Sequence, residues 1–325
     1  MEIPLGIRDF YYDKEIGVFL ICFSEMNIVS RTDTFLGNIK FPWEKGDTSH
    51  VAMGGCLVYR CQKIGDVHKF QKGFGYSFPQ QTGRVDWSPE GEIFSVGLDD
   101  GQIYLFSHDK TSNYNNFNEM AKVKPHKDRV MGIYYDHDSG KCYSCSTDKL
   151  FSVTDIMDYL KEKKEKEAEA KEITDPKEAK NIKEPTAKST VIFKSNTGFT
   201  NIMYDKPTKR FFLTNEGGEI FIFANSDPLP KQVLLMKTSK GGCLRGLWMD
   251  INKKIMFTAS TTGRISHFLI GEEGKEVDTK EMKEFGLKVK SRLVVVDMER
   301  KEAFTGDEVG RITVWNIETG NVKCK

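Results

Sequence analysis

The sequence predicts an all-β fold built from a repeated four-stranded unit, because two short tracts recur along it at a constant spacing. The first tract is an apolar strand that ends in an acid or a serine. Its copies are Phe10–Asp13, Val85–Ser88, Ile133–Asp136, Ile202–Asp205, Leu247–Asp250 and Val294–Asp297. We expect this tract to be the innermost strand of each unit.

The second tract is a turn, centred on glycine in most copies, that leads into a strand of alternating hydrophobicity. Turn residues followed by a period-two pattern predict a β-hairpin. The copies are Asp99–Phe106, Thr147–Thr154, Glu216–Phe223, Thr261–Phe268 and Glu308–Trp315.

The distance between the two tracts is 13 residues in five copies, as from Ser88 to Gly101. The same offset from Asp13 predicts a turn at Met26, followed by a third strand. Successive copies begin 75, 48, 69, 45 and 47 residues apart. The short steps match the roughly 40–45 residues of a propeller blade, so we predict a single β-propeller domain over residues 1–325.

The two long steps each hold extra residues. Residues 35–64 are either a degenerate extra blade, which gives seven blades, or an insertion between the third and fourth strands of a six-bladed propeller; we favour seven. Residues 158–188 form a charged insertion between a third and a fourth strand. The pair Glu162 and Lys166 has helical i,i+4 spacing, but no apolar stripe exists, so we expect either an exposed helix or a disordered tether.

These tracts resemble those of WD-repeat proteins. Trp315-Asn316 stands where the family has its Trp-Asp dipeptide, and Pro125-His126 stands where it has Gly-His. The resemblance implies a structural hydrogen-bond tetrad that includes His126, Ser144 and Asp148, with Thr154 in place of its tryptophan. Within the family, the sequence is most similar to the propeller of FYVE-containing proteins, but it has no Cys-rich finger, so their lipid binding does not carry over.

Aligning the first tract by its terminal acid brings three arginines to one position: Arg8, Arg245 and Arg292. Three lysines lie just upstream of the later copies: Lys240, Lys288 and Lys290. Guanidinium groups bind carboxylates and phosphates in a bidentate manner, so these residues predict a docking site for an acidic or phosphorylated peptide. The alternative is that each arginine pairs with a local acid, such as Asp9 beside Arg8.

The composition excludes several classes of function. Lys and Arg (48) nearly balance Asp and Glu (47), which gives no indication of nucleic-acid binding. No apolar run is long enough for a transmembrane segment, and the seven cysteines are typical of free thiols in the cytoplasm. Cys142 and Cys145 point to opposite faces of a predicted strand, so we expect no metal site there.

No catalytic or cofactor-binding motif is present, so we expect neither enzymatic activity nor a cofactor. The sequence therefore favours a protein-interaction scaffold that is a subunit of a larger hetero-complex, of cytoskeletal, ciliary or trafficking type. The alternative is a peripheral adaptor at endosomal membranes.

Overall fold

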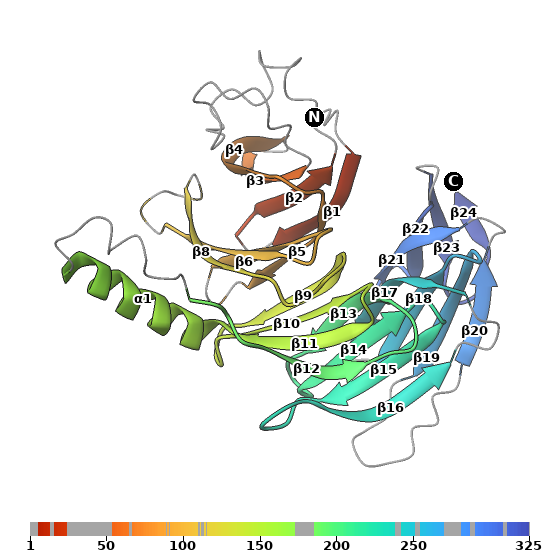
Figure 1. The fold of residues 1–325 in the computed structure, drawn as a ribbon. Coiled ribbons are helices and arrows are strands. Elements are labelled where there is room, and N and C mark those ends of the chain that lie inside the picture. Colours follow the sequence, from red (N-terminus) through yellow and green to blue (C-terminus); the bar gives the residue numbers. More distant parts are fainter. Residues whose placement is uncertain are drawn as a thin grey trace. The chain divides into compact units, whose positions relative to one another are not determined.

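The computed structural model of the chain describes residues 6–13, 16–24, 54–64, 67–88, 90, 92–109, 111, 114, 116–172, 185–237, 242–250, 254–269, 281–286, 290–307 and 311–324. These residues form six four-stranded antiparallel sheets and one helix (Figure 1). In every sheet the strands follow one another in chain order. We call the four strands a, b, c and d, with a first in the chain.

The chain divides into two compact units, residues 1–191 and 192–325. The first unit holds sheets 1 and 2 and most of sheet 3. Sheet 1 contains β1 (Gly6–Asp13), β2 (Val18–Ser24), β3 (Gly54–Ile64) and β4 (Val67–Phe78). Sheet 2 contains β5 (Thr82–Ser88), β6 (Ile93–Leu98), β7 (Ile103–His108) and β8 (Phe117–Val123). Sheet 3 contains β9 (Val130–Asp136), β10 (Lys141–Ser146), β11 (Leu150–Asp155) and β12 (Ser189–Lys194).

The second unit holds sheets 4 to 6. Sheet 4 contains β13 (Phe199–Asp205), β14 (Arg210–Asn215), β15 (Glu219–Ala224) and β16 (Lys231–Lys237). Sheet 5 contains β17 (Leu244–Asp250), β18 (Ile255–Ser260), β19 (Arg264–Leu269) and β20 (Glu281–Gly286). Sheet 6 contains β21 (Ser291–Asp297), β22 (Glu302–Asp307), β23 (Ile312–Asn316) and β24 (Val322–Cys324).

The described residues therefore have six blades, the alternative that we ranked below seven. Residues 54–64 of the expected extra blade are strand c of sheet 1. β3 pairs with the whole of β2, from Gly54 opposite Ser24 to Arg60 opposite Val18. The predicted turn at Met26 lies outside the described residues. The 13-residue offset fails in this copy because 29 residues, 25–53, separate strands b and c.

The two insertions also differ from expectation in where they leave their sheets. Connections in an antiparallel meander alternate between the two ends of the strands. Residues 25–53 connect strands b and c of sheet 1, whereas residues 156–188 connect strands c and d of sheet 3. They therefore leave from opposite ends of their sheets, and not from the same end as the six-bladed alternative implied.

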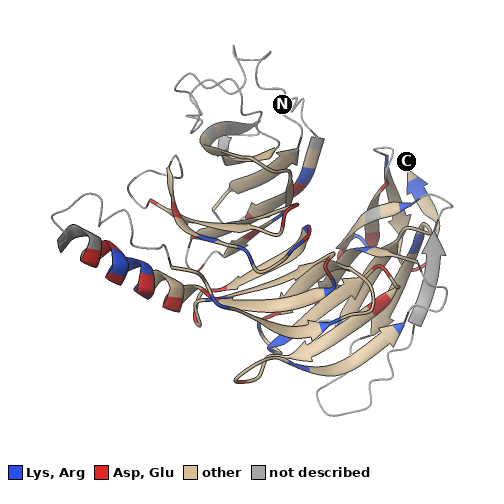
Figure 2. Cartoon of the chain, viewed as in Figure 1, with Lys and Arg blue, Asp and Glu red and all other residues tan. Residues whose placement is uncertain are grey.

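The charged insertion begins with helix α1 (Ile156–Glu172). Asp155 caps it, since its Oδ1 accepts a hydrogen bond from Asp158 N at 2.9 Å. Ile156 and Tyr159 in the first turn are buried against sheets 2 and 3. Beyond that turn the helix is charged (Figure 2), with Lys166 Nζ 2.8 Å from Glu162 Oε1.

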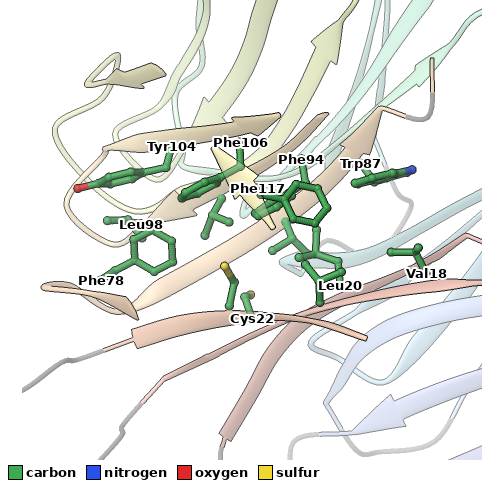
Figure 3. Close-up of a cluster of buried hydrophobic side chains, with 14 residues drawn as sticks. Val18, Leu20, Cys22, Phe78, Trp87, Phe94, Leu98, Tyr104, Phe106 and Phe117 are labelled. Carbon is green, nitrogen blue, oxygen red and sulfur yellow. The ribbon is translucent and has the colours of Figure 1, made fainter. Parts of the chain in front are cut away.

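Both faces of a central strand are buried, because neighbouring sheets cover them. In β7, Tyr104 and Phe106 pack against sheet 1. Ile103 and Leu105 point the other way and pack against sheet 3. The cluster between sheets 1 and 2 is rich in aromatic rings (Figure 3), and Phe94 stacks on Phe106 at 4.8 Å. Equivalent clusters join sheet 4 to sheet 5 and sheet 5 to sheet 6.

The terminal acid of the first tract caps the turn between strands a and b. Asp297 Oδ1 accepts hydrogen bonds from Glu299 N and Arg300 N at 3.0 Å each. Asp136 Oδ1 accepts one from Asp138 N at 3.2 Å. Since a short carboxylate can satisfy the backbone donors of a turn, this explains why the tract so often ends in aspartate.

The residue four places after that acid or serine is left-handed in all six sheets. Its φ lies between 48° and 67° in Gly17, Glu92, Gly140, Lys209, Lys254 and Lys301. The four described turns between strands b and c contain a second left-handed position, with φ between 74° and 86° in Gly101, Lys149, Gly218 and Gly263. Both hairpin turns thus keep their backbone shape although glycine is often replaced.

Because Lys209 has a left-handed backbone at a position where two other sheets have glycine, we predict that Lys209→Gly stabilises the protein. Lys209 is exposed, and glycine removes the steric cost of its left-handed backbone, which exceeds the entropy lost by the glycine. We expect the free energy of unfolding to rise by about 0.5–1 kcal/mol, measured by urea denaturation. Lys209→Ala keeps the Cβ and should give no gain, and an equal gain in both variants would contradict the explanation.

Candidate protein-binding site

A β-bulge interrupts strand a of every sheet near its start. In β17, Leu244 pairs with Ser260 and Gly246 pairs with Ala259, so Arg245 is the extra residue. The equivalent extra residues in the six sheets are Arg8, Gly83, Met131, Thr200, Arg245 and Arg292. The three aligned arginines therefore all occupy bulge positions, where a side chain is released from the regular alternation of the strand.

Arg8 lies exposed in β1 of the first unit, and its Nη2 donates a hydrogen bond to Gln81 Oε1 at 2.9 Å. Its expected partner Asp9 is engaged elsewhere: Asp9 Oδ2 accepts a hydrogen bond from Val85 N at 3.2 Å, and Oδ1 lies 3.6 Å from Arg84 Nη1. In the structure, Asp9 therefore pairs with Arg84 and not with Arg8.

Arg245 and Arg292 lie on neighbouring inner strands of the second unit. A Cβ at Gly246 would lie only 2.7 Å from Val294 N, so β17 and β21 approach closely just after the two arginines. Arg245 Nη2 is 3.7 Å from Glu216 Oε1, a long ion pair, and its buried Nε has no hydrogen-bond partner among the described residues. The described residues thus satisfy the guanidinium of Arg245 only in part.

The remaining predicted site residues are less informative. Lys290 is exposed, directly before β21, and takes part in a polar interaction. The side chain of Arg292, and Lys240 and Lys288 altogether, lie outside the described residues. Arg8 belongs to the first unit and the other two arginines to the second, so the convergence of all three stays a prediction.

The structure brings His126, Ser144 and Asp148 together in sheet 3. The buried His126 ring has Nε2 2.9 Å from Ser144 Oγ and Nδ1 3.1 Å from Asp148 Oδ2. Lys127 N donates to the same carboxylate at 3.0 Å. Burial alone would raise the pKa of Asp148, but these hydrogen bonds bring it below its usual value. At the tryptophan position, Thr154 Oγ1 lies 2.8 Å from Ser189 Oγ of strand d.

Sheet 6 holds one half of a similar arrangement. Trp315 Nε1 donates a hydrogen bond to Thr305 Oγ1 at 2.8 Å, and both residues are buried. Thr305 occupies the position of Ser144, eight residues after the terminal acid. The sequence comparison missed this pair, although the same alignment could have found it.

A partly buried charge cluster on the inner strands of sheets 1 and 2 was also missed. Arg84 Nε donates to Met131 O at 3.0 Å while the same guanidinium faces Asp9. Burial raises the pKa of Asp9, against the opposite effect of Arg84. Burial also raises the pKa of Asp86 to about 7, although the carboxyl accepts a hydrogen bond from the Tyr135 backbone. Asp9 and Arg84 occupy the same aligned position, which was the available signal.

Three further features of the described part of the chain bear on the predictions. Its His, Cys, Asp and Glu side chains form no group of three able to hold a metal ion. Cys142 and Cys145 are both buried on β10. Helix α1, the helix of the described residues, is too short and too polar to cross a membrane.

The His126 hydrogen bonds predict a measurable contribution to stability. We expect His126→Ala to lower the free energy of unfolding by about 2–3 kcal/mol, since it leaves a cavity and deprives buried polar groups of their partner. His137→Ala, at an exposed turn of the same sheet, should change it by less than about 0.5 kcal/mol. Additive effects of His126→Ala and Ser144→Ala in a double-mutant cycle would argue against coupling.

The raised pKa of Asp86 predicts a pH dependence. The folded state binds the proton more tightly than the unfolded chain does, so wild-type stability falls as the pH rises towards about 7. Asp86→Asn cannot ionise and should gain on the order of 2 kcal/mol relative to wild type between pH 5 and pH 8. Urea denaturation at each pH measures this, with the exposed Asp138→Asn as control. A pH-independent difference would show that Asp86 keeps an ordinary pKa.

Comparisons with known proteins agree with the fold. No family model and no curated protein matches the sequence. Among solved structures, the chain is similar to Chaetomium thermophilum Sqt1 bound to the N-terminus of the ribosomal protein L10, with a TM-score of 0.62 and 12% sequence identity. The match covers 98% of this chain and 86% of Sqt1. This likeness and the six four-stranded sheets of the described residues show a six-bladed β-propeller fold.

Proposed function

We propose that the chain is a non-enzymatic protein-interaction scaffold that docks an acidic or phosphorylated peptide at the arginine-bearing ends of its inner strands. The observation that carries this proposal is the row of bulge positions, at which arginine occurs in three sheets of six. Of the three arginines, Arg245 gives the strongest support. Its buried Nε has no partner among the described residues, and its contact with Glu216 is long.

Charge and fold both support this function. A ligand carboxylate or phosphate would give the terminal nitrogens of Arg245 a closer acceptor than Glu216, and Arg292 lies on the adjacent strand. The structure of Sqt1 is bound to the N-terminus of a ribosomal protein, so this type of fold is able to hold a peptide segment. The comparisons give no support to the alternative of an endosomal adaptor.

The test compares the full chain with the variant Arg245→Glu/Arg292→Glu. Affinity purification from the native source, followed by cross-linking, should recover a partner whose cross-links reach Lys290. We expect the variant to lose at least about tenfold of this binding, and wild-type binding to weaken with rising salt, because exposed charge pairs are screened.

The control is Arg300→Glu, which makes the same substitution at a single arginine at the opposite end of β21, in the turn between strands a and b. It should bind like wild type. Equal binding by all three proteins would reject the arginine site. Cross-links confined to the outer strands or to α1 would relocate the partner and reject the proposed face.

A further inference from the structure

Two free cysteines face each other across strands β2 and β3. Cys22 is paired with Cys56 in the strand register, and both side chains are fully buried in the cluster between sheets 1 and 2. Figure 3 shows Cys22 in this cluster, together with Leu20 and Phe78. Since directly paired residues point to the same side of a sheet, the two thiols share one environment.

The hydrogen-bond pattern identifies which kind of pair this is. Cys61 N donates to Gly17 O at 2.6 Å, which makes Gly17 and Cys61 a hydrogen-bonded pair in the same register. Hydrogen-bonded and non-hydrogen-bonded pairs alternate along an antiparallel ladder. Five residues further along, Cys22 and Cys56 therefore form a non-hydrogen-bonded pair.

Non-hydrogen-bonded pairs are the closer of the two kinds, with Cα atoms about 4.5 Å apart. Disulfides join residues whose Cα atoms are about 4.4–6.8 Å apart. The backbone of β2 and β3 thus already satisfies the distance that a disulfide requires. Cys142 and Cys145 provide a contrast, because they lie three apart on one strand and point to opposite faces.

We propose that Cys22 and Cys56 form a reversible disulfide that fastens strand b to strand c of sheet 1 under oxidising conditions. The bond would close a loop of about 33 residues that contains the whole connection 25–53, and so would hold both ends of that connection together. Its oxidant is a small-molecule disulfide, such as oxidised glutathione.

The reaction is a thiol–disulfide exchange in two steps. One cysteine thiolate attacks a sulfur of the oxidant, whose S–S bond breaks, forming a mixed disulfide and releasing one small thiol. The second thiolate then attacks the mixed disulfide, forming the Cys22–Cys56 bond and releasing the second small thiol. The protein loses two electrons and two protons, and the oxidant gains both.

Burial makes this exchange slow in the closed fold. Burial raises the pKa of both thiols above their usual range, so few thiolates exist, and neither sulfur is accessible to an oxidant. Oxidation therefore requires transient opening of sheet 1. Once formed, the bond is protected from reductants by the same burial.

The experiment uses the full chain with the more accessible Cys61, Cys243 and Cys324 replaced by serine. The reduced protein is equilibrated with oxidised glutathione in buffer and in dilute urea, alkylated and examined by intact mass and peptide mapping. We expect a mass loss of about 2 Da assigned to Cys22–Cys56, at least tenfold faster in dilute urea. The oxidised protein should have a Tm higher by about 5 °C.

Cys56→Ala in the same background should show neither the mass loss nor the rise in Tm, whereas Cys145→Ala should show both. An oxidised protein whose Tm is equal to or below that of the reduced protein would mean that the native strands cannot hold the bond. Full alkylation of Cys22 and Cys56 after oxidation in dilute urea would equally overturn the proposal.

Discussion

The burial of both faces of each four-stranded sheet is the constraint on which the rest of this structure depends. A strand such as β7 places aromatic rings on one side and aliphatic side chains on the other, and each set needs a neighbouring sheet. One sheet alone would expose both of these apolar surfaces to water, at a cost of about 25 cal/mol for each Å² of apolar area. The repeat in the sequence is thus a repeat of mutual burial, as in other repeat proteins.

Backbone geometry is kept more strictly between the sheets than residue identity. Every strand a has its bulge, and every turn between strands a and b has its left-handed residue, but that residue is glycine in only two sheets. Lys209, Lys254 and Lys301 adopt the same φ as glycine at a small local cost. A sequence that changes residues while keeping the backbone offers little to residue-based comparison, in keeping with the absence of a matching family model.

The fold was largely predictable, because strand a and the turn between strands b and c each carry a local signal. Five sheets follow the 13-residue offset. The first sheet does not, because no sequence signal in residues 14–53 indicates that strand c begins only at Gly54. That single displacement led to the preference for seven blades and hid the pairing of Cys22 with Cys56. Pairing between strands depends on the register of distant segments, which spacing rules do not contain.

The candidate site was predictable only in part. Alignment alone located Arg8, Arg245 and Arg292 at one position, and the structure adds the reason, which is the bulge. The partners of these residues could not be derived, because Gln81 and Glu216 approach from a different sheet in each case. A contact between sheets is decided by how two repeats pack, and that information is not local.

The distribution of tryptophan gives this protein built-in optical probes. Trp87 lies in the cluster of sheets 1 and 2, and its indole Nε1 has no hydrogen-bond partner among the described residues. Trp315 lies in the cluster of sheets 5 and 6, and its indole donates to Thr305. Among the described residues, each compact unit holds one buried indole, and the two have different polar environments. Variants that keep one of these two and replace the other three tryptophans would therefore let intrinsic fluorescence follow each unit separately, without any added label.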